Sequence, residues 1–94
     1  MRKSIIQKEY CCKVCGTTHN LHSHEVFFGK ANRKKSIQDK MVVYLCGYHH
    51  NLSDKGIHFD EDLNLKTKRE AQLVWEQTYG DRVQFIKRYG KSYL

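Results

Sequence analysis

The sequence predicts a small α+β domain that depends on a bound metal ion. The chain has 94 residues, of which 39% are hydrophobic, and a core this small usually needs a disulfide or a metal ion to be stable. Strand-like segments occupy the first half and helix-like segments the second, which is the α+β order. Its four cysteines and six histidines all precede residue 59. We therefore expect one domain over residues 1–94, with its chemistry in the first two thirds.

Two strands are expected in the first half of the chain. Residues 20–28 mix β-branched, aromatic and polar side chains and predict a strand with His22 and His24 on one face. The basic, hydrophilic residues 30–36 predict a loop. Residues 41–46 are a continuous apolar run and predict a buried strand. A short helix or turn should follow, ending at Gly56.

Helices are expected in the last third. An acidic stretch at residues 60–62 precedes residues 66–79, which favour a helix with Ala71, Val74 or Trp75, and Thr78 on one face. A second helix should begin after Asp81 as N-cap and end before Gly90. We expect both helices to pack on the sheet. The domain thus divides into a basic arm at residues 1–9, either loose or docked, a metal-binding core at 10–59 and C-terminal helices at 60–94.

Two ligand pairs of equal spacing predict a structural zinc site. Cys12 and Cys15 form the first pair, and Cys46 and His49 the second. Two-residue spacing lets both side chains of a pair bind one ion, and two pairs complete the tetrahedron that Zn²⁺ prefers. Cys11 could replace Cys12 as a ligand. Only Cys12 reproduces the spacing of the second pair, so we interpret Cys11 as a spectator thiol.

Three further histidines predict a second metal site. His24 lies on the first predicted strand, His50 directly follows the second zinc pair, and His58 comes eight residues later. Imidazoles that crowd together are stabilised when they bind a cation. The sequence therefore predicts an exchangeable divalent ion beside the zinc.

These motifs together resemble the HNH endonucleases, and more narrowly the small HNH proteins of phages and prophages. The resemblance rests on the zinc pairs, on Leu-His-Ser-His-Glu-Val-Phe-Phe-Gly at residues 21–29, on Arg-Lys-Lys-Ser at 33–36, on Gly-Ile-His-Phe at 56–59 and on the closing Tyr-Gly-Lys-Ser-Tyr-Leu at 89–94. It covers nearly the whole chain from Cys12. It implies a ββα-metal fold and metal-dependent cleavage of DNA phosphodiester bonds.

The resemblance also implies roles for individual residues. His24 and Glu25 match the pair in which one residue binds the catalytic ion and the other is the general base. Glu25 replaces the family's usual histidine, which leaves open which of the two is the base. His50 matches a metal ligand, and His58 is a candidate for a further one. Mg²⁺ or Mn²⁺ is the expected catalytic ion, and histidine ligands also accept Ni²⁺ or Zn²⁺.

A basic segment predicts contact with nucleic acid. The chain carries a net charge of +7, and Lys30, Arg33, Lys34 and Lys35 fall between the two predicted strands. We expect them to bind DNA phosphates, with little sequence preference. The alternative is a zinc-stabilised nucleic-acid binding module without catalysis. Two departures from the family motivate it: Glu25, and the lack of an asparagine near Lys40.

Membrane and export signals are not expected. The longest apolar run, residues 41–46, is far shorter than a membrane span, and residues 1–9 lack the apolar segment of a signal peptide. We therefore expect no membrane partner and a reducing, cytoplasmic setting in which disulfides are rare. The resemblance implies a bacterial host cell and phage or prophage origin. Such a protein works either alone or beside packaging or recombination proteins.

Overall fold

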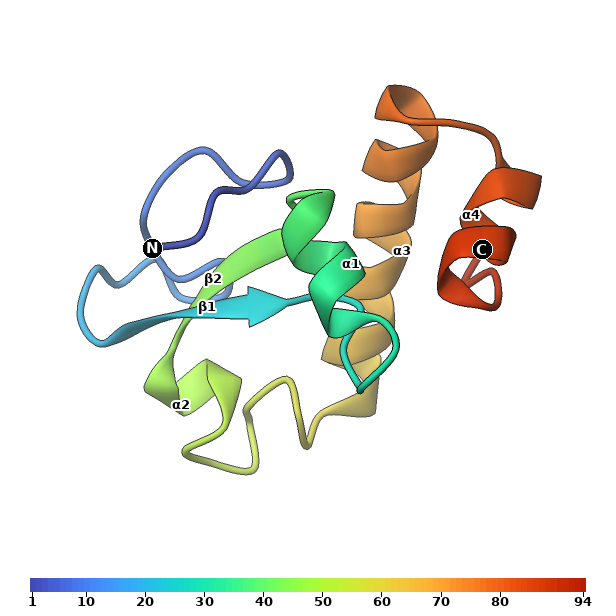
Figure 1. Cartoon of the computed structure of the whole chain (residues 1–94). Coiled ribbons are helices and arrows are strands. Elements are labelled where there is room, and N and C mark those ends of the chain that lie inside the picture. The colour runs from blue at the N-terminus through green and yellow to red at the C-terminus, as the bar shows by residue number, and fades with distance from the viewer.

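A computed structural model describes residues 1–94 and shows an α+β arrangement (Figure 1). The elements follow one another as β1 (Leu21–Glu25), α1 (Arg33–Gln38), β2 (Val42–Cys46), α2 (Gly47–His50), α3 (Glu61–Thr78) and α4 (Arg82–Tyr89). The α+β class expected from the sequence is confirmed. No helix is both long enough and apolar enough to span a bilayer.

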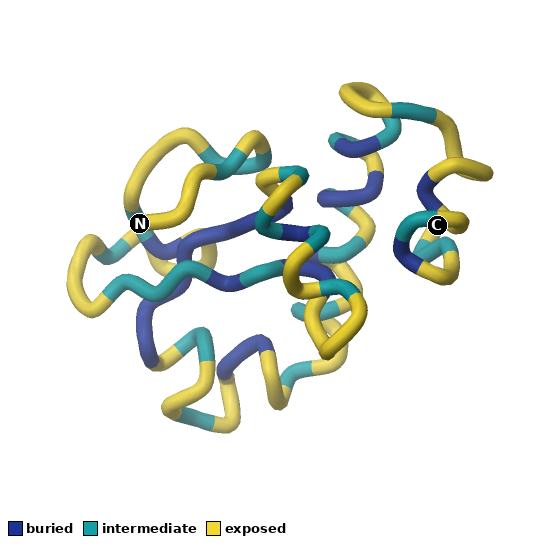
Figure 2. Tube along the Cα trace, viewed as in Figure 1, coloured by how far each residue is buried: buried dark blue, intermediate teal, exposed yellow.

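The two strands form an antiparallel sheet. His24 lies opposite Val43 and His22 opposite Leu45. All five residues of β2 are buried, as expected for this apolar run and as the tube in Figure 2 shows. β1 ends at Glu25, three residues before the expected end, and the chain beyond it turns towards α1. The sheet therefore brings histidines of β1 next to a fully buried partner strand.

The expected basic loop is wrong, because α1 occupies its second half. Ser36 in this helix is buried, and its hydroxyl donates to the Phe27 carbonyl at 2.6 Å and accepts from the Phe27 N–H at 3.1 Å. No side chain caps the start of α1. This helix thus depends on contact with the end of β1 and not on a local signal.

α3 begins five residues before the expected position, at Glu61. The Asp60 side chain caps it by accepting a hydrogen bond from the Leu63 N–H at 3.0 Å. Glu61 and Asp62 then lie in the first turn, where negative charge stabilises the helix dipole. Its buried side includes Ala71 and Trp75, whereas the expected Thr78 is exposed.

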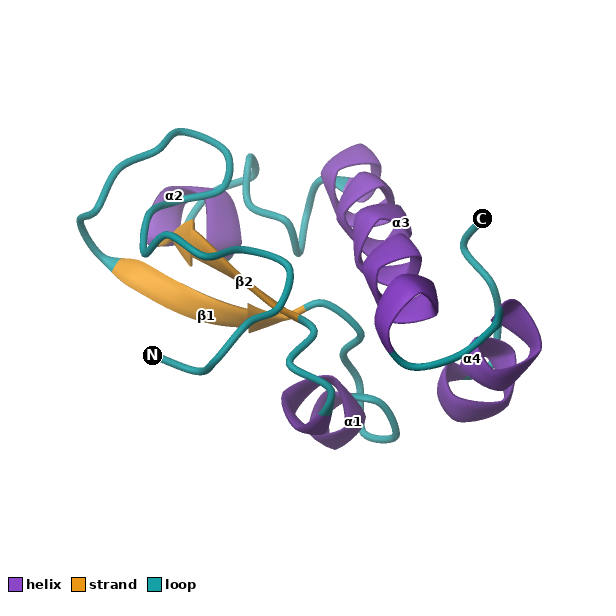
Figure 3. Cartoon of the chain, turned by 90° about the horizontal axis from the view of Figure 1, so that it is seen from above, coloured by secondary structure: helices purple, strands orange, loops and turns teal.

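α4 matches the sequence prediction. Asp81 caps it, and Gly90 follows it in the left-handed conformation with φ of 100°. The two C-terminal helices lie beside each other at one side of the sheet, as Figure 3 shows from above. Phe85 and Tyr89 of α4, Trp75 of α3 and Val43 of β2 belong to one buried cluster. Both helices therefore join the buried cluster to which β2 contributes.

The side chain of Asp39 ties the end of α1 to the C-terminal helices. It accepts hydrogen bonds from Trp75 Nε1 at 2.8 Å, Arg88 Nε at 2.6 Å and the Tyr89 hydroxyl at 2.7 Å. Burial, together with the hydrogen bond to Asp39, raises the pKa of Tyr89. This carboxylate therefore joins α1, α3 and α4 through three side-chain donors.

The N-terminal segment docks on the sheet, which decides between the two possibilities for residues 1–9. The Tyr44 N–H donates to Gln7 Oε1 at 2.9 Å, and the Tyr44 hydroxyl donates to the Arg2 carbonyl at 2.6 Å. The Ile5 N–H donates to the Lys40 carbonyl at 3.1 Å. These bonds cover the edge of β2 that β1 leaves open.

Candidate metal centres

The four residues expected to bind zinc converge. One ligand atom each from Cys12, Cys15, Cys46 and His49 lies within 4.8 Å of every other. The Cys15 and Cys46 sulfurs are 3.8 Å apart, and His49 Nδ1 lies 3.3 Å from the Cys46 sulfur and 3.7 Å from that of Cys12. A tetrahedral zinc ion places two sulfurs about 3.8 Å apart, and sulfur and nitrogen about 3.6 Å apart. The group could therefore hold a metal ion, with the ligand types and spacing of a zinc site.

Local backbone geometry builds this group. Gly16 takes a φ of 78° and its N–H donates to the Cys12 carbonyl at 2.8 Å, which closes the first turn around the thiols. The second pair spans the end of β2 and the start of α2. Cys11 is not in the group, so the choice of Cys12 as the ligand is supported by the structure.

The thiols of this group differ in acidity. Burial raises the pKa of Cys12, but backbone N–H groups of Cys46, Cys15 and Val14 outweigh burial and lower it to about 6. Burial, followed by the neighbouring thiols, raises the pKa of Cys46. The Cys12 thiolate is thus favoured, and Cys46 needs a nearby cation before it ionises.

A second group consists of His24, His50 and His58. One ring nitrogen from each lies within 4.8 Å of the others, and His50 Nε2 is 3.1 Å from His58 Nε2. Two nitrogens about 2.1 Å from one ion are about 3.0 to 3.4 Å apart at octahedral and tetrahedral angles. His24 Nε2 is buried and has no hydrogen-bond partner. A cation would provide that missing partner, so the residues fit a metal ion.

Three different elements position these histidines. His24 lies on β1 and is 2% exposed, and His50 lies on α2. His58 reaches them because its N–H donates to the His50 carbonyl at 3.3 Å. Gly56 makes this approach possible: a Cβ atom there would lie 2.5 Å from the His50 carbonyl oxygen. Of the expected helix or turn up to Gly56, the helix alternative is wrong, because α2 ends at His50 and turns follow it.

His24 and His50 are both held in the neutral form at pH 7. Burial lowers the pKa of His24 to about 3, with further lowering by His50, His58 and Lys68. Burial, followed by His58 and His22, lowers the pKa of His50 to about 4. Neutral imidazole is the form that binds a metal ion.

A cleft of about 340 Å³ opens over the three histidines, and Arg2, Glu25, Phe28 and Arg33 help to line it. Glu25 Oε1 lies 3.0 Å from Arg33 Nε and 3.6 Å from Arg2 Nε. Its side chain is 11% exposed. The carboxylate that follows His24 is therefore held at the same cleft by two arginines.

The four basic residues expected to bind DNA do not all face one way. Lys30, Arg33 and Lys34 line a second cleft of about 470 Å³, which shares Arg33 with the cleft over the histidines. Lys35 points elsewhere, because its ammonium group donates to the Arg88 carbonyl at 2.7 Å. Three of the four residues are thus placed for a common ligand, and Lys35 supports the packing of α1 on α4.

The structure adds two residues that the sequence analysis did not assign. His22 Nδ1 lies 2.8 Å from His50 Nδ1. The predicted shared face of His22 and His24 was the signal that could have assigned it to the histidine group. Lys68 of α3 lies 4.5 Å from the ring centroid of Phe28, whose ring is 5.2 Å from that of His58. No sequence signal related Lys68 to the histidines.

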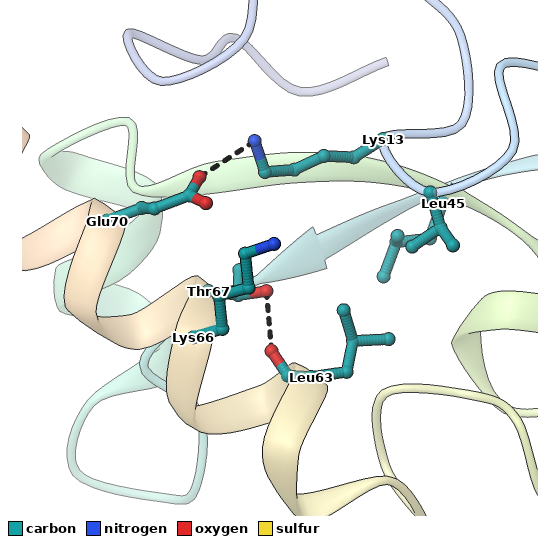
Figure 4. A pocket seen from close by; sticks show the side chains of 7 residues that line it. Lys13, Leu45, Leu63, Lys66, Thr67 and Glu70 are labelled. Atoms are coloured by element: carbon teal, nitrogen blue, oxygen red, sulfur yellow. Dashed lines mark hydrogen bonds and ion pairs between the residues drawn. The ribbon is translucent and has the colours of Figure 1, made fainter.

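A separate cavity of about 260 Å³ lies between the first zinc turn and α3. Lys13 and Glu70 form an ion pair of 2.9 Å beside it, and Leu45 and Leu63 contribute apolar lining (Figure 4). None of the six histidines lines this cavity. The concentration of metal-binding side chains therefore points to the cleft over His24, His50 and His58 as the candidate site.

Comparison with known proteins gave no match to a family model, to a curated protein or to a solved structure.

Proposed function

We propose that this protein is a metal-dependent endonuclease of the HNH type that hydrolyses DNA phosphodiester bonds with little sequence specificity. One observation carries the proposal: three imidazoles converge on one point in a cleft that two arginines flank. The likeness of the motifs to HNH proteins supplies the reaction. The chemistry of the cleft supports it, because ligands for a cation and groups for a phosphate lie together.

The positions of the residues favour particular roles. His24 is buried, with Nε2 unpartnered among the other two histidines, so it suits a ligand better than a base. Glu25 then remains as the general base that takes a proton from an attacking water. A divalent ion held by His24, His50 and His58 would offset the negative charge that develops on the phosphate.

The charges around the cleft suit a nucleic-acid backbone. Arg33 joins the cleft over the histidines to the one lined by Lys30 and Lys34, and its planar guanidinium can bind a phosphate through two hydrogen bonds. The Lys68 ammonium group lies over the Phe28 ring, which lines the same cleft, and has no carboxylate within ion-pair distance. We expect a strand to cross the cleft between these cations.

A plasmid assay tests the proposal. Zinc-loaded wild-type protein is incubated with supercoiled DNA and Mg²⁺, Mn²⁺ or Ni²⁺, beside H50A, E25Q and the control H19A, whose histidine is exposed and outside both metal groups. We expect nicking by the wild type and by H19A, and a loss of about 100-fold or more in H50A, because a metal ligand contributes several kcal/mol.

Two outcomes would argue against a nuclease centred on these histidines. Nicking that persists in H50A would exclude the proposed centre. DNA binding by the wild type without cleavage in any of the three metals would favour the non-catalytic binding module. The two ion pairs of Glu25 are the observation that favours this second candidate, since two arginines engage Oε1 of the carboxylate that should act as base.

A further inference from the structure

We propose that His22 is a positioning residue of the second metal centre, which orients His50 and fixes the ring nitrogen that carries its proton. The inference rests on the proposed metal centre at His24, His50 and His58. His22 is not one of the three converging residues. It therefore acts through His50.

The contact between the two rings is direct. His22 Nδ1 lies 2.8 Å from His50 Nδ1, and the rings meet edge to face with an interplanar angle of 86°. The other ring nitrogen of His50, Nε2, lies 3.1 Å from His58 Nε2. Both nitrogens of His50 are thus engaged, one towards the metal-binding group and one towards His22.

This arrangement has one proton pattern that permits metal binding. A nitrogen that binds a metal ion carries no proton, so a neutral His50 that binds through Nε2 keeps its proton on Nδ1. His50 Nδ1–H then donates to His22 Nδ1, and His22 keeps its own proton on Nε2. With the reverse pattern, a proton on His50 Nε2 would block the ligand position.

The outer nitrogen of a metal-binding histidine usually donates to a carboxylate, a backbone carbonyl or water, and loss of that partner weakens metal binding by about 10- to 100-fold. Here the acceptor is the His22 ring. No other side chain or backbone group contacts His50 Nδ1 within hydrogen-bond distance. Removal of the His22 ring therefore removes the contact that holds the proton on Nδ1, and the proton can then exchange between the two nitrogens of His50.

Two variants of similar shape separate this role from simple packing. His22→Asn keeps an acceptor close to the position of Nδ1, whereas His22→Leu fills the same space on a strand without any acceptor. Zinc-loaded proteins are titrated with Ni²⁺ by calorimetry. We expect the Leu variant to bind Ni²⁺ about 10- to 100-fold more weakly than the wild type, and the Asn variant to stay within about threefold of it.

Nitrogen NMR of the histidine rings gives a readout that packing alone would not change. In zinc-loaded protein without Ni²⁺, we expect the His50 proton to stay on Nδ1 in the wild type and in His22→Asn. In His22→Leu we expect this one proton to exchange between Nδ1 and Nε2. Equal Ni²⁺ affinity or an unchanged proton position in His22→Leu would overturn the role of His22 alone. A wild type that binds no Ni²⁺ would overturn the metal centre as well.

Discussion

Two adjacent cysteines provide the sharpest test of the zinc group. Cys12 belongs to the group and is 2% exposed, whereas Cys11 lies outside it. Both hydrogen bonds of Cys11 involve its backbone, with Glu9 and with the Gln7 side chain, so a serine there keeps them. We compare C12S with C11S, which differ by one position and make the same chemical change.

The expected effects differ by several kcal/mol. Structural zinc contributes about 10–16 kcal/mol in small zinc domains, which is about 2.5–4 kcal/mol for each of the four ligands of this group. The serine hydroxyl at position 12 is not ionised at neutral pH, and an unsatisfied buried hydroxyl adds about 1–3 kcal/mol. C12S should therefore lose about 4–7 kcal/mol, against about 5–14 kcal/mol for the whole domain. C11S should lose less than about 1 kcal/mol.

Urea unfolding with excess zinc measures both variants. Trp75 is the one tryptophan of the chain and is buried, so its fluorescence reports unfolding, with circular dichroism as a second probe. We expect C11S to unfold at the same urea concentration as the wild type. We expect C12S to unfold at a much lower urea concentration, or to be unfolded in buffer without urea. Removal of zinc from the wild type by a strong chelator should have the same effect. Equal unfolding midpoints for the two variants would refute the zinc group.

Three other expectations concern charge, backbone space and pH. R33Q should weaken DNA binding and reduce the slope of log affinity against log salt by about 0.9. K35Q should leave the slope unchanged, because Lys35 donates to the Arg88 carbonyl. Equal slopes for the two variants would contradict the placement of Arg33 at the DNA and of Lys35 away from it. G56A should weaken Ni²⁺ binding, because the added Cβ would lie 2.5 Å from the His50 carbonyl oxygen. Wild-type Ni²⁺ affinity of G56A in calorimetry would contradict the close contact between residue 56 and His50. Burial beside Asp39 raises the pKa of Tyr89, so its contribution to stability is complete below the unfolded value near 10 and is lost as pH rises above it. Urea unfolding from pH 9 to 11 should show a steeper loss in the wild type than in Y89F, and parallel losses would exclude this contribution.

Local patterns predicted the parts of the fold that depend on neighbouring residues. The spacing of Cys12 and Cys15 and of Cys46 and His49 identified a group that the structure brings together. The apolar run at residues 41–46 predicted a buried strand. Asp81 and Gly90 predicted both ends of α4 because a cap acts within one helical turn.

The parts that the sequence did not predict depend on distant contacts. α1 depends on the hydrogen bonds of Ser36 to Phe27. The helix propensities of residues 33–38 do not include this contact, so they could not predict the helix. The direction of the Lys35 side chain depends on a carbonyl 53 residues away in sequence. The start of α3 is a different case, because Asp60 is an ordinary helix cap and the acidic residues after it are a recognised helix-start signal. The acidic residues 60–62 are therefore the start of the helix and not a stretch that precedes it.

One peptide bond separates the two metal groups. His49 turns towards the thiols and His50 towards the other imidazoles, both from the four-residue α2. Because so short a helix has no stability of its own, occupancy of the thiol group should set the direction in which His50 points. In the proposed nuclease, a chelator would then act twice, by withdrawing the catalytic cation and by releasing the turn that presents His50. Reactivation would follow an order: zinc first, to restore the turn, and the second cation only afterwards.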